Sequence, residues 1–181
     1  WSLRDSFFFS TILHEGGQGV FQVIVVILIL VWAASFYVNI IKPYRKLLLY
    51  FAVVVPISIA LTTNIGKLLT HVDCPWDLIR YGGDKPYLSI FASHPGTYTY
   101  GKRFPAGHSS IGYSLFSLYF VLLEIAPKKR FYGLATGLLI GLLFGMAQQL
   151  RGAHFISHDL WTVGICLLIS LLGYLILFKA K

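Results

Sequence analysis

Two histidines in this sequence stand beside small residues, and this combination is suited to binding and transferring phosphate. The first, His108, lies in the stretch FPAGHSS at residues 104–110, at the start of an apolar segment. Small residues before a helix let successive backbone N–H groups converge on one point, where the helix N-terminus adds partial positive charge. The alternative is an ordinary helix cap, with Ser109 as the capping residue and His108 at an interface.

The second histidine, His154, lies in the stretch RGAHFISHD at residues 151–159. Glycine and alanine again allow close backbone approach beside the ring. A carboxylate such as Asp159 near an imidazole fixes its tautomer and supports the cation that forms in catalysis. We expect Ser157 to cap the helix that follows. The alternative is a polar turn between helices whose residues pair with one another.

A third group of polar residues begins with Lys67, at the end of another apolar segment, and continues through Asp73, Asp77 and Arg80. Lysines near the ends of membrane helices commonly extend their charge to the interface, and this alternative accounts for Lys67 taken alone. The two aspartates are expected to be solvated or paired with nearby arginines.

The elements that must position these residues are membrane helices. Of the 181 residues, 56% are hydrophobic and 12% are charged, about half the charged share of a soluble domain. Five apolar stretches are long enough to cross a bilayer, at residues 18–41, 47–69, 109–126, 131–150 and 160–178. We therefore predict an all-α, polytopic transmembrane helical bundle that forms a single domain over residues 1–181.

Charge and cysteine usage exclude other classes. The net charge of +8 is divided among loops and forms no continuous basic stripe, so nucleic-acid binding is not indicated. The two cysteines lie far apart, so neither a disulfide nor a metal site is expected.

The basic residues predict the orientation of the bundle. Two short loops and the C-terminus, which fall on one side of five spans, contain Lys42, Arg45, Lys46, Lys128, Lys129, Arg130, Lys179 and Lys181. The positive-inside rule makes that side cytoplasmic. The opposite side then holds an interfacial segment (1–17), a long loop (71–108) and the turn at 151–159. All the histidines fall there: His14, His71, His94, His108, His154 and His158.

The three polar groups resemble, in order, the signature of the type 2 phosphatidic acid phosphatase superfamily. Its membrane branch includes lipid phosphate phosphatases and undecaprenyl diphosphate phosphatases. The signature consists of a lysine, six residues and Arg-Pro; then Pro-Ser-Gly-His; then Ser-Arg, five residues, a histidine, three residues and an aspartate. Here Lys67 precedes Cys74-Pro75 by six residues, residues 105–108 are PAGH, and His154 follows Gly152-Ala153. The family usually places the first part at the end of its third span, which implies a span before residue 1.

Three positions depart from the signature. Cys74 replaces the first arginine, Gln148 occupies the place of the second, and His158 occupies the place of the aspartate. Nearby residues are expected to substitute. Arg151 lies one helical turn from Gln148, Asp159 follows His158, and Arg80 or Arg103 could supply the cation missing at Cys74.

The resemblance implies a role for each residue. His154 attacks phosphorus and forms a phosphohistidine, Asp159 or His158 orients its ring, and His108 protonates the departing oxygen. The phosphate is bound by Lys67, Arg151, Arg80 or Arg103, and by backbone N–H groups of Gly107 and Ser109. No metal or cofactor is implied.

The expected activity is metal-independent hydrolysis of a lipid phosphate at the outer face of a bacterial cytoplasmic (inner) membrane. Candidate lipids are undecaprenyl diphosphate, lipid A, phosphatidylglycerol phosphate and phosphatidic acid. One alternative is transfer of the phosphate to another lipid, and another is a membrane binding or assembly subunit that kept the fold and lost the chemistry.

Overall fold

The computed structural model describes residues 3–70, 72–89 and 101–180, with the side chains of all of these except residues 13–15 and 18. Within these ranges the chain is helical and has no strand, which confirms the predicted all-α bundle. Two of the six histidines, His71 and His94, lie outside the described residues, as does Lys181, and the His14 side chain is likewise not described.

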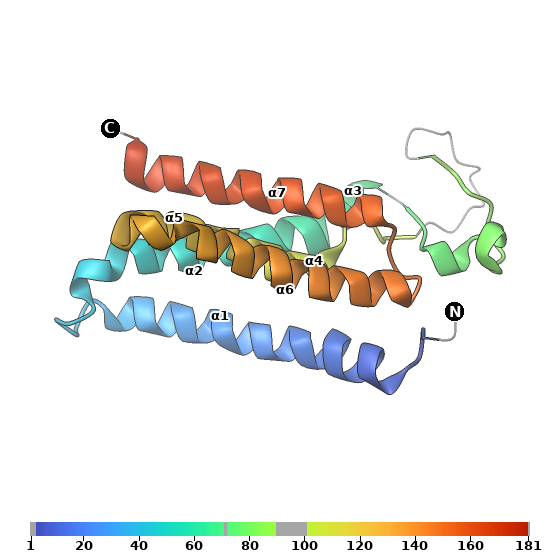
Figure 1. Cartoon of the computed structure of the whole chain (residues 1–181), viewed down its shortest axis with the longest axis horizontal. Helices are drawn as coiled ribbons and strands as arrows, with labels where there is room; N and C mark the ends of the chain where they lie inside the picture. Colours follow the sequence, from blue (N-terminus) through green and yellow to red (C-terminus); the bar gives the residue numbers. More distant parts are fainter. Residues whose placement is uncertain (1–2, 71, 90–100, 181) are drawn as a thin grey trace.

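Five antiparallel helical runs form the bundle, and they correspond to the five expected spans (Figure 1). In chain order the runs are η1 and α1 (Phe8–Gly16, Gly17–Ala34); α2, η3 and α3 (Arg45–Ala60, Leu61–Ile65, Gly66–Thr70); α4, η6 and α5 (Gly107–Tyr113, Ser114–Phe116, Ser117–Ile125); α6 (Arg130–Leu150); and α7 with η8 (Ile156–Tyr174, Leu175–Lys179).

Three of these runs are long and apolar enough to cross a membrane: Lys42–Asp77, Pro127–Leu150 and Ile156–Lys179. A shorter apolar helix covers Gly19–Ala34. Large apolar side chains on their outer faces are exposed, among them Leu139 and Ile176, each 68% exposed. A helix pairs its own backbone polar groups, so it can present such a surface to lipid at little cost. The chain is thus built as a membrane protein.

Close approach between helices depends on glycine where α4 crosses α6. A Cβ on Gly112 of α4 would overlap the backbone of Gly141 in α6, and a Cβ on Gly141 would overlap the ring of Tyr113. Small residues at such crossings are typical of membrane helix pairs, because they let the two backbones pack directly. This contact fixes α4, and with it the start of the 107–125 run, against α6.

The first span differs from its predicted boundaries. Its helix begins at Phe8, inside the segment expected to be interfacial, and ends at Ala34 rather than at residue 41. The reversal after Ala34 is held by Arg45, whose Nη2 donates to the Ser35 carbonyl over 2.6 Å and whose Nε donates to the Ser35 hydroxyl.

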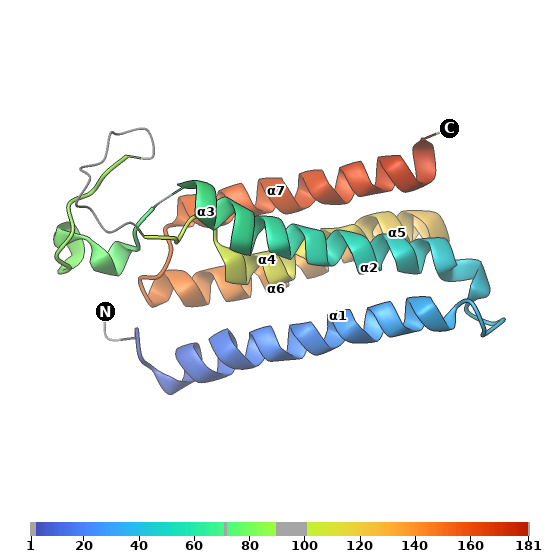
Figure 2. The same ribbon diagram turned by 180° about the vertical axis from the view of Figure 1, so that it is seen from behind.

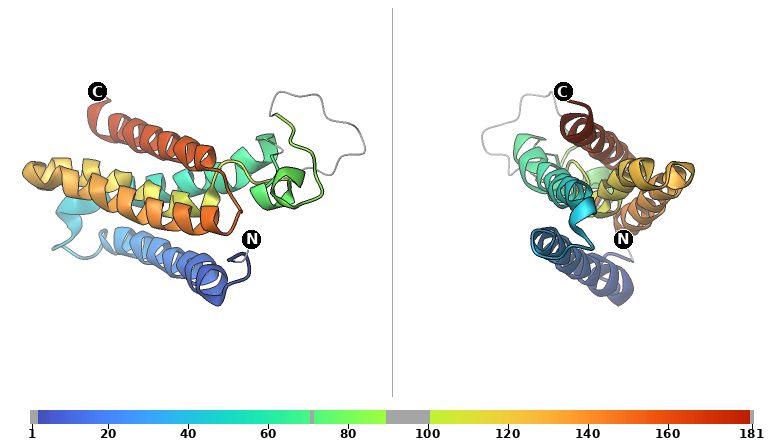
Figure 3. Two further views of the ribbon diagram at one scale, coloured as in Figure 1. Left: turned by 45° about the vertical axis from the view of Figure 1, so that its right-hand side comes forward. Right: turned by 90° about the vertical axis from the view of Figure 1, so that its left-hand side faces the viewer.

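Both ends of the bundle have a distinct composition. The α1–α2 and α5–α6 connections and the end of η8 lie at one end, and they contain the basic residues from Lys42 to Lys46, from Lys128 to Arg130, and Lys179 (Figures 1 and 2). The N-terminus, α3, the start of α4 and the α6–α7 turn lie at the other end, as the view turned by 45° also shows (Figure 3, left). The predicted site residues therefore share one end.

Two short 3₁₀ helices interrupt the long 71–108 connection, η4 (Pro75–Asp77) and η5 (Ile79–Tyr81). An ion pair fixes it, with Lys85 Nζ 2.7 Å from Asp73 Oδ1. Asp73 is buried and pairs with this lysine, so it is not the solvated carboxylate that was one of the two expectations for it.

Candidate active site

The turn between α6 and α7 places His154 inside the protein. After α6 ends at Leu150, Gly152 adopts the left-handed region at φ 79°, which glycine accepts without strain. The Ala153 N–H then donates to the Gln148 carbonyl (2.9 Å), and the Gly152 carbonyl accepts from the Trp76 N–H (3.1 Å). His154 follows this turn and is only 6% exposed.

His154 faces His158 of α7. The two Nδ1 atoms are 3.1 Å apart, and His158 is 3% exposed. The backbone of Arg103 lies beside the His158 ring. Because the Arg103 N–H donates to the Val72 carbonyl, the Arg103 carbonyl is the backbone group that is able to accept a proton from this ring.

The contact between the two rings allows His154 to donate from Nδ1 to Nδ1 of His158 when His158 carries its own proton on Nε2. In that tautomer pair the Nε2 lone pair of His154 is left over, as it is when a carboxylate orients a histidine.

Asp159 points elsewhere. It lies in the first turn of α7, as predicted, but its carboxylate accepts a hydrogen bond from the Gln149 side chain and packs against Gly145 of α6. The helix begins after Phe155, so the prediction that Ser157 caps it was wrong. Of the two residues expected to orient His154, the structure brings His158 to it.

Lys67 and the 104–108 segment meet at the same end. The Lys67 Nζ lies 3.3 Å from the position that a Cβ on Gly107 would occupy. The segment is held by two side chains from neighbouring helices. Thr70 donates to the Phe104 carbonyl (2.6 Å), and Thr162 of α7 donates to the Ala106 carbonyl (3.2 Å). Any side chain on Gly107 would displace Lys67.

Charges from three segments act on His154. Burial lowers the pKa of His154 well below the ordinary histidine value, and the imidazole of His158 lowers it further. Lys67, His108 and Arg103 act in the same direction. His154 is therefore neutral near pH 7, with cationic groups around it that favour an anion.

Arg103 is better placed than Arg80 to supply the cation missing at Cys74. Its charge acts on Lys67 and Cys74 as well as on His154. Arg80 is exposed, with its guanidinium 5.9 Å from the centre of the Tyr81 ring. Cys74 itself is fully buried, and its N–H donates to Asp77 over 3.3 Å.

The other two expected phosphate ligands make local contacts. Arg151 is buried, donates through Nε to the Arg4 carbonyl (2.9 Å), and contacts Gln148 as expected (3.4 Å). Ser109 donates to the Ala106 carbonyl (3.0 Å) as the third residue of α4, so it does not cap this helix.

Sequence reasoning missed how Trp76 and Arg4 support this end of the bundle. The guanidinium carbons of Arg4 and Arg103 lie 4.5 and 5.9 Å from the centre of the Trp76 ring. Through these contacts and the Arg4–Arg151 hydrogen bond, the N-terminal segment is attached beside the site. Trp76 stands between the lysine and histidine motifs in the sequence, and this position was the signal that could have indicated its role.

The geometry agrees with a family comparison. Residues 43–181 match the PAP2 superfamily. The chain belongs to this superfamily. No curated protein and no solved structure matched the chain. Membership in the PAP2 superfamily, whose members are generally phosphatases, supports a phosphatase that acts on lipid phosphates in general.

Proposed function

We propose that this PAP2 protein hydrolyses a membrane lipid phosphate or diphosphate through a phosphohistidine on His154. The observation that carries the proposal is the buried pair of His154 and His158, whose Nδ1 atoms are 3.1 Å apart. Lys67, His108 and Arg103 act on His154, and they come from separate segments of the chain.

In the first half-reaction, Nε2 of His154 attacks phosphorus and the bond from phosphorus to the lipid oxygen breaks. His108 gives its proton to the departing oxygen. The attacking ring becomes cationic, and His158 keeps it oriented by accepting the Nδ1–H hydrogen bond. Lys67 and Arg103 balance charge on the phosphoryl oxygens, where one well-placed donor is worth about 2.7–4 kcal/mol in the transition state.

In the second half-reaction, water attacks the phosphohistidine and His108 takes the water proton. The phosphorus–nitrogen bond breaks, which releases inorganic phosphate and restores neutral His154. Protein cations balance the phosphate charge in this scheme, so we propose that no metal ion takes part.

The membrane location suits a lipid substrate, since its chain can stay in the bilayer while its phosphate reaches the end of the bundle. The basic loops lie at the opposite end, and by the positive-inside rule this favours a periplasmic site in a bacterial inner membrane. Candidates remain undecaprenyl diphosphate, lipid A, phosphatidylglycerol phosphate and phosphatidate.

Phosphate release by the purified protein tests this function. The four candidate lipids are incubated with the enzyme in EDTA, and free phosphate is measured. At least one lipid should be hydrolysed, His154→Ala should abolish release, and Arg80→Ala should retain it because Arg80 is exposed on Tyr81. Wild-type release by His154→Ala would contradict the proposal.

The same assay separates the two alternatives. If phosphate is recovered on an added acceptor lipid rather than in water, the chain is a phosphotransferase. If the protein binds the lipids without releasing or transferring phosphate, it is a binding subunit, an outcome for which the buried Cys74 in place of an arginine is the structural argument.

A further inference from the structure

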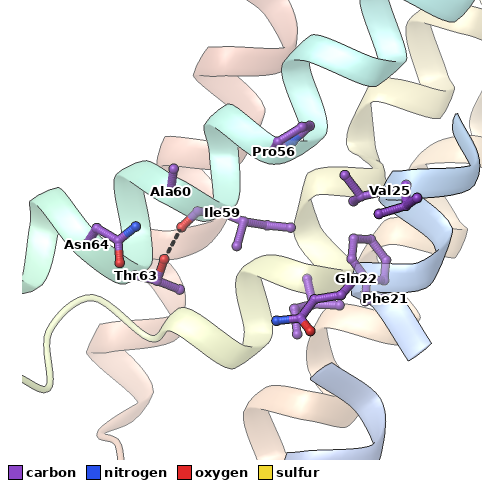
Figure 4. A pocket seen from close by; sticks show the side chains of 10 residues that line it. Phe21, Gln22, Val25, Pro56, Ile59, Ala60, Thr63 and Asn64 are labelled. Carbon is purple, nitrogen blue, oxygen red and sulfur yellow. Dashed lines mark hydrogen bonds between the residues drawn. The ribbon is translucent and has the colours of Figure 1, made fainter. Parts of the chain in front are cut away.

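Two grooves run along α2, and they lie toward opposite ends of the bundle. The first lies between α1 and α2, where Thr63 and Asn64 line it about one helical turn from Lys67 (Figure 4). The second has a volume of about 390 Å³ and lies between α2 and α7, nearer the basic end. The proposed reaction takes place at the other end of the bundle and does not use this second groove.

The α2–α7 groove matches one leaflet of a bilayer in length. Its lining extends from Leu49 to Ile57 on α2, and from Ile169 to Leu177 on α7 and η8. Each wall rises by about 12 Å along its helix. One leaflet contributes half of the hydrocarbon core, or about 15 Å. The groove therefore has room along it for the acyl chain of a lipid in the leaflet at the basic end.

Gly173 lets α2 and α7 approach closely where they form this groove. A Cβ on Gly173 would lie 2.5 Å from a methyl carbon of Val54, which also lines the groove. Val53, Leu172 and Ile176 line it as well, and their side chains are exposed. The groove is therefore open to the membrane, and an apolar chain is the kind of group that suits its walls.

Two lysines lie where α2 and η8 meet at the basic end. Lys46 precedes Leu49 by three residues, so both lie on the face of α2 that lines the groove. The Lys46 Nζ is 4.9 Å from the centre of the Phe178 ring in η8, so this side chain reaches from one helix to the other. The Lys179 Nζ is 5.6 Å from the centre of the Tyr174 ring, which stacks on Phe178 at 5.3 Å.

No carboxylate in the described part of the chain forms an ion pair with either lysine. Glu124, in the last turn of α5, instead accepts a hydrogen bond from the Tyr174 hydroxyl over 2.6 Å. An ammonium group that rests on an aromatic ring still has N–H donors to offer a ligand. Lys46 and Lys179 are both exposed, so their charge complements the headgroup of an anionic lipid.

We infer that the α2–α7 groove binds an anionic phospholipid of the leaflet at the basic end, with its headgroup on Lys46 and Lys179. This lipid is not the substrate, because Lys67 and His158 lie at the other end of the same two helical runs. An acyl chain gains little by leaving its lipid neighbours, so the headgroup provides the selectivity. Each lysine near the membrane surface contributes about fivefold in affinity for an anionic lipid. The bound lipid holds together the two runs that carry Lys67 and His158.

Thermal unfolding in a neutral detergent tests this site without any measurement of activity. The protein is titrated with phosphatidylglycerol or phosphatidylcholine, and a lipid that binds the folded state raises the unfolding temperature. Phosphatidylglycerol should raise it more, and its apparent Kd should increase about thirtyfold in Lys46→Ala/Lys179→Ala. Val53→Trp should also weaken binding, without a change in charge, because it fills the groove. The matched control, Lys128→Ala/Lys129→Ala, removes the same charge from the α5–α6 connection and should bind nearly as wild type.

Equal stabilisation of the wild type by the two lipids would overturn the inference, since the groove would then take any bilayer lipid. Equal losses in the two double variants would also overturn it, because they indicate diffuse attraction to the whole basic end. Wild-type affinity in Val53→Trp would place the lipid outside the groove. If a variant does not fold, a photoactivatable phosphatidylglycerol is applied to the wild type in nanodiscs. It should label α2, α7 or η8 beside the groove, and labelling elsewhere contradicts the inference.

Discussion

His158 occupies the place where the superfamily signature has an aspartate, and this exchange changes the chemistry at the nucleophile. In the proposed mechanism a carboxylate would stabilise the cationic His154 ring by charge, whereas a neutral imidazole orients the ring by accepting its Nδ1–H hydrogen bond. This role requires the His158 proton on the ring nitrogen away from His154, where the Arg103 carbonyl is able to accept it. An imidazole also remains uncharged in a buried site, where an unpaired carboxylate would be costly.

Substitution of His158 tests this arrangement. His158→Ala removes the acceptor for the His154 Nδ1 proton, so kcat should fall about a hundredfold or more. His158→Asp replaces it with the acceptor of the signature and should keep far more activity than the alanine variant. Thermal unfolding of both variants in detergent checks that they fold. Equal impairment of the two would show that His158 does not orient His154.

The depressed pKa of His154 predicts that the enzyme keeps its activity to an unusually low pH. Burial and neighbouring cations keep His154 neutral below the ordinary histidine value of 6.5. The kcat/KM profile for a soluble phosphate, corrected for ionisation of the substrate itself, should therefore lose activity only well below pH 6.5.

Stability should begin to respond to the same group at a higher pH than activity does. Below about pH 6.5 the unfolded chain binds a proton at His154 and the folded chain does not, so the free energy of unfolding should fall as the pH is lowered. An acid limit of activity near or above pH 6.5 would show that His154 is not the buried neutral nucleophile.

At the scale of elements, sequence patterns were sufficient to place the helices. Apolar runs of the right length predicted five spans, and five antiparallel runs are present. The boundaries of the first span were wrong because hydropathy does not detect local hydrogen bonds, such as those from Arg45 to Ser35 that fix the reversal.

The site was predictable only in part. Motif order placed Lys67, His108 and His154 at one end of the bundle, and the structure places them there. The choice between His158 and Asp159 was not predictable, since adjacent helical residues point roughly 100° apart and only the packing of α7 decides which one faces His154. The substitute for the arginine missing at Cys74 also depends on tertiary structure. Arg80 is close to Cys74 in the chain, whereas Arg103 is distant in the chain and acts on Cys74 only in the fold.

The α4–α6 crossing should be sensitive to one added methyl group. Gly141→Ala would place a Cβ against the Tyr113 ring, and we expect it to lower the free energy of unfolding by about 1–3 kcal/mol. Gly164→Ala on α7 is the matched control, because a Cβ there meets no atom within 4 Å. Thermal unfolding in detergent should separate the two, and equal stability would show that this crossing is loosely packed.

At the scale of the whole molecule, charge divides the bundle into a basic end and a catalytic end. The positive-inside rule predicts that the basic end faces the cytoplasm. Asp84 and Lys129 are exposed at opposite ends, and Cys74 and Cys166 are both buried. On intact cells, a membrane-impermeant maleimide should label Asp84→Cys and leave Lys129→Cys unlabelled. The reverse pattern would place the site in the cytoplasm.

The orientation also decides which lipids can reach the site, because a lipid must present its phosphate in the leaflet next to Lys67 and His154. The whole account then depends on a single covalent event, the transfer of phosphate from lipid to His154.

Mass spectrometry of the trapped enzyme tests that event most directly. His108→Ala removes the base that activates water, so this variant is mixed with p-nitrophenyl phosphate, whose leaving group departs without a proton, and is then quenched in alkali and digested. The account predicts an acid-labile phosphate on the peptide that contains His154, and none when His154→Ala is added to the same variant. Phosphate on another residue, or release of phosphate with no phosphorylated enzyme at any time, would contradict it.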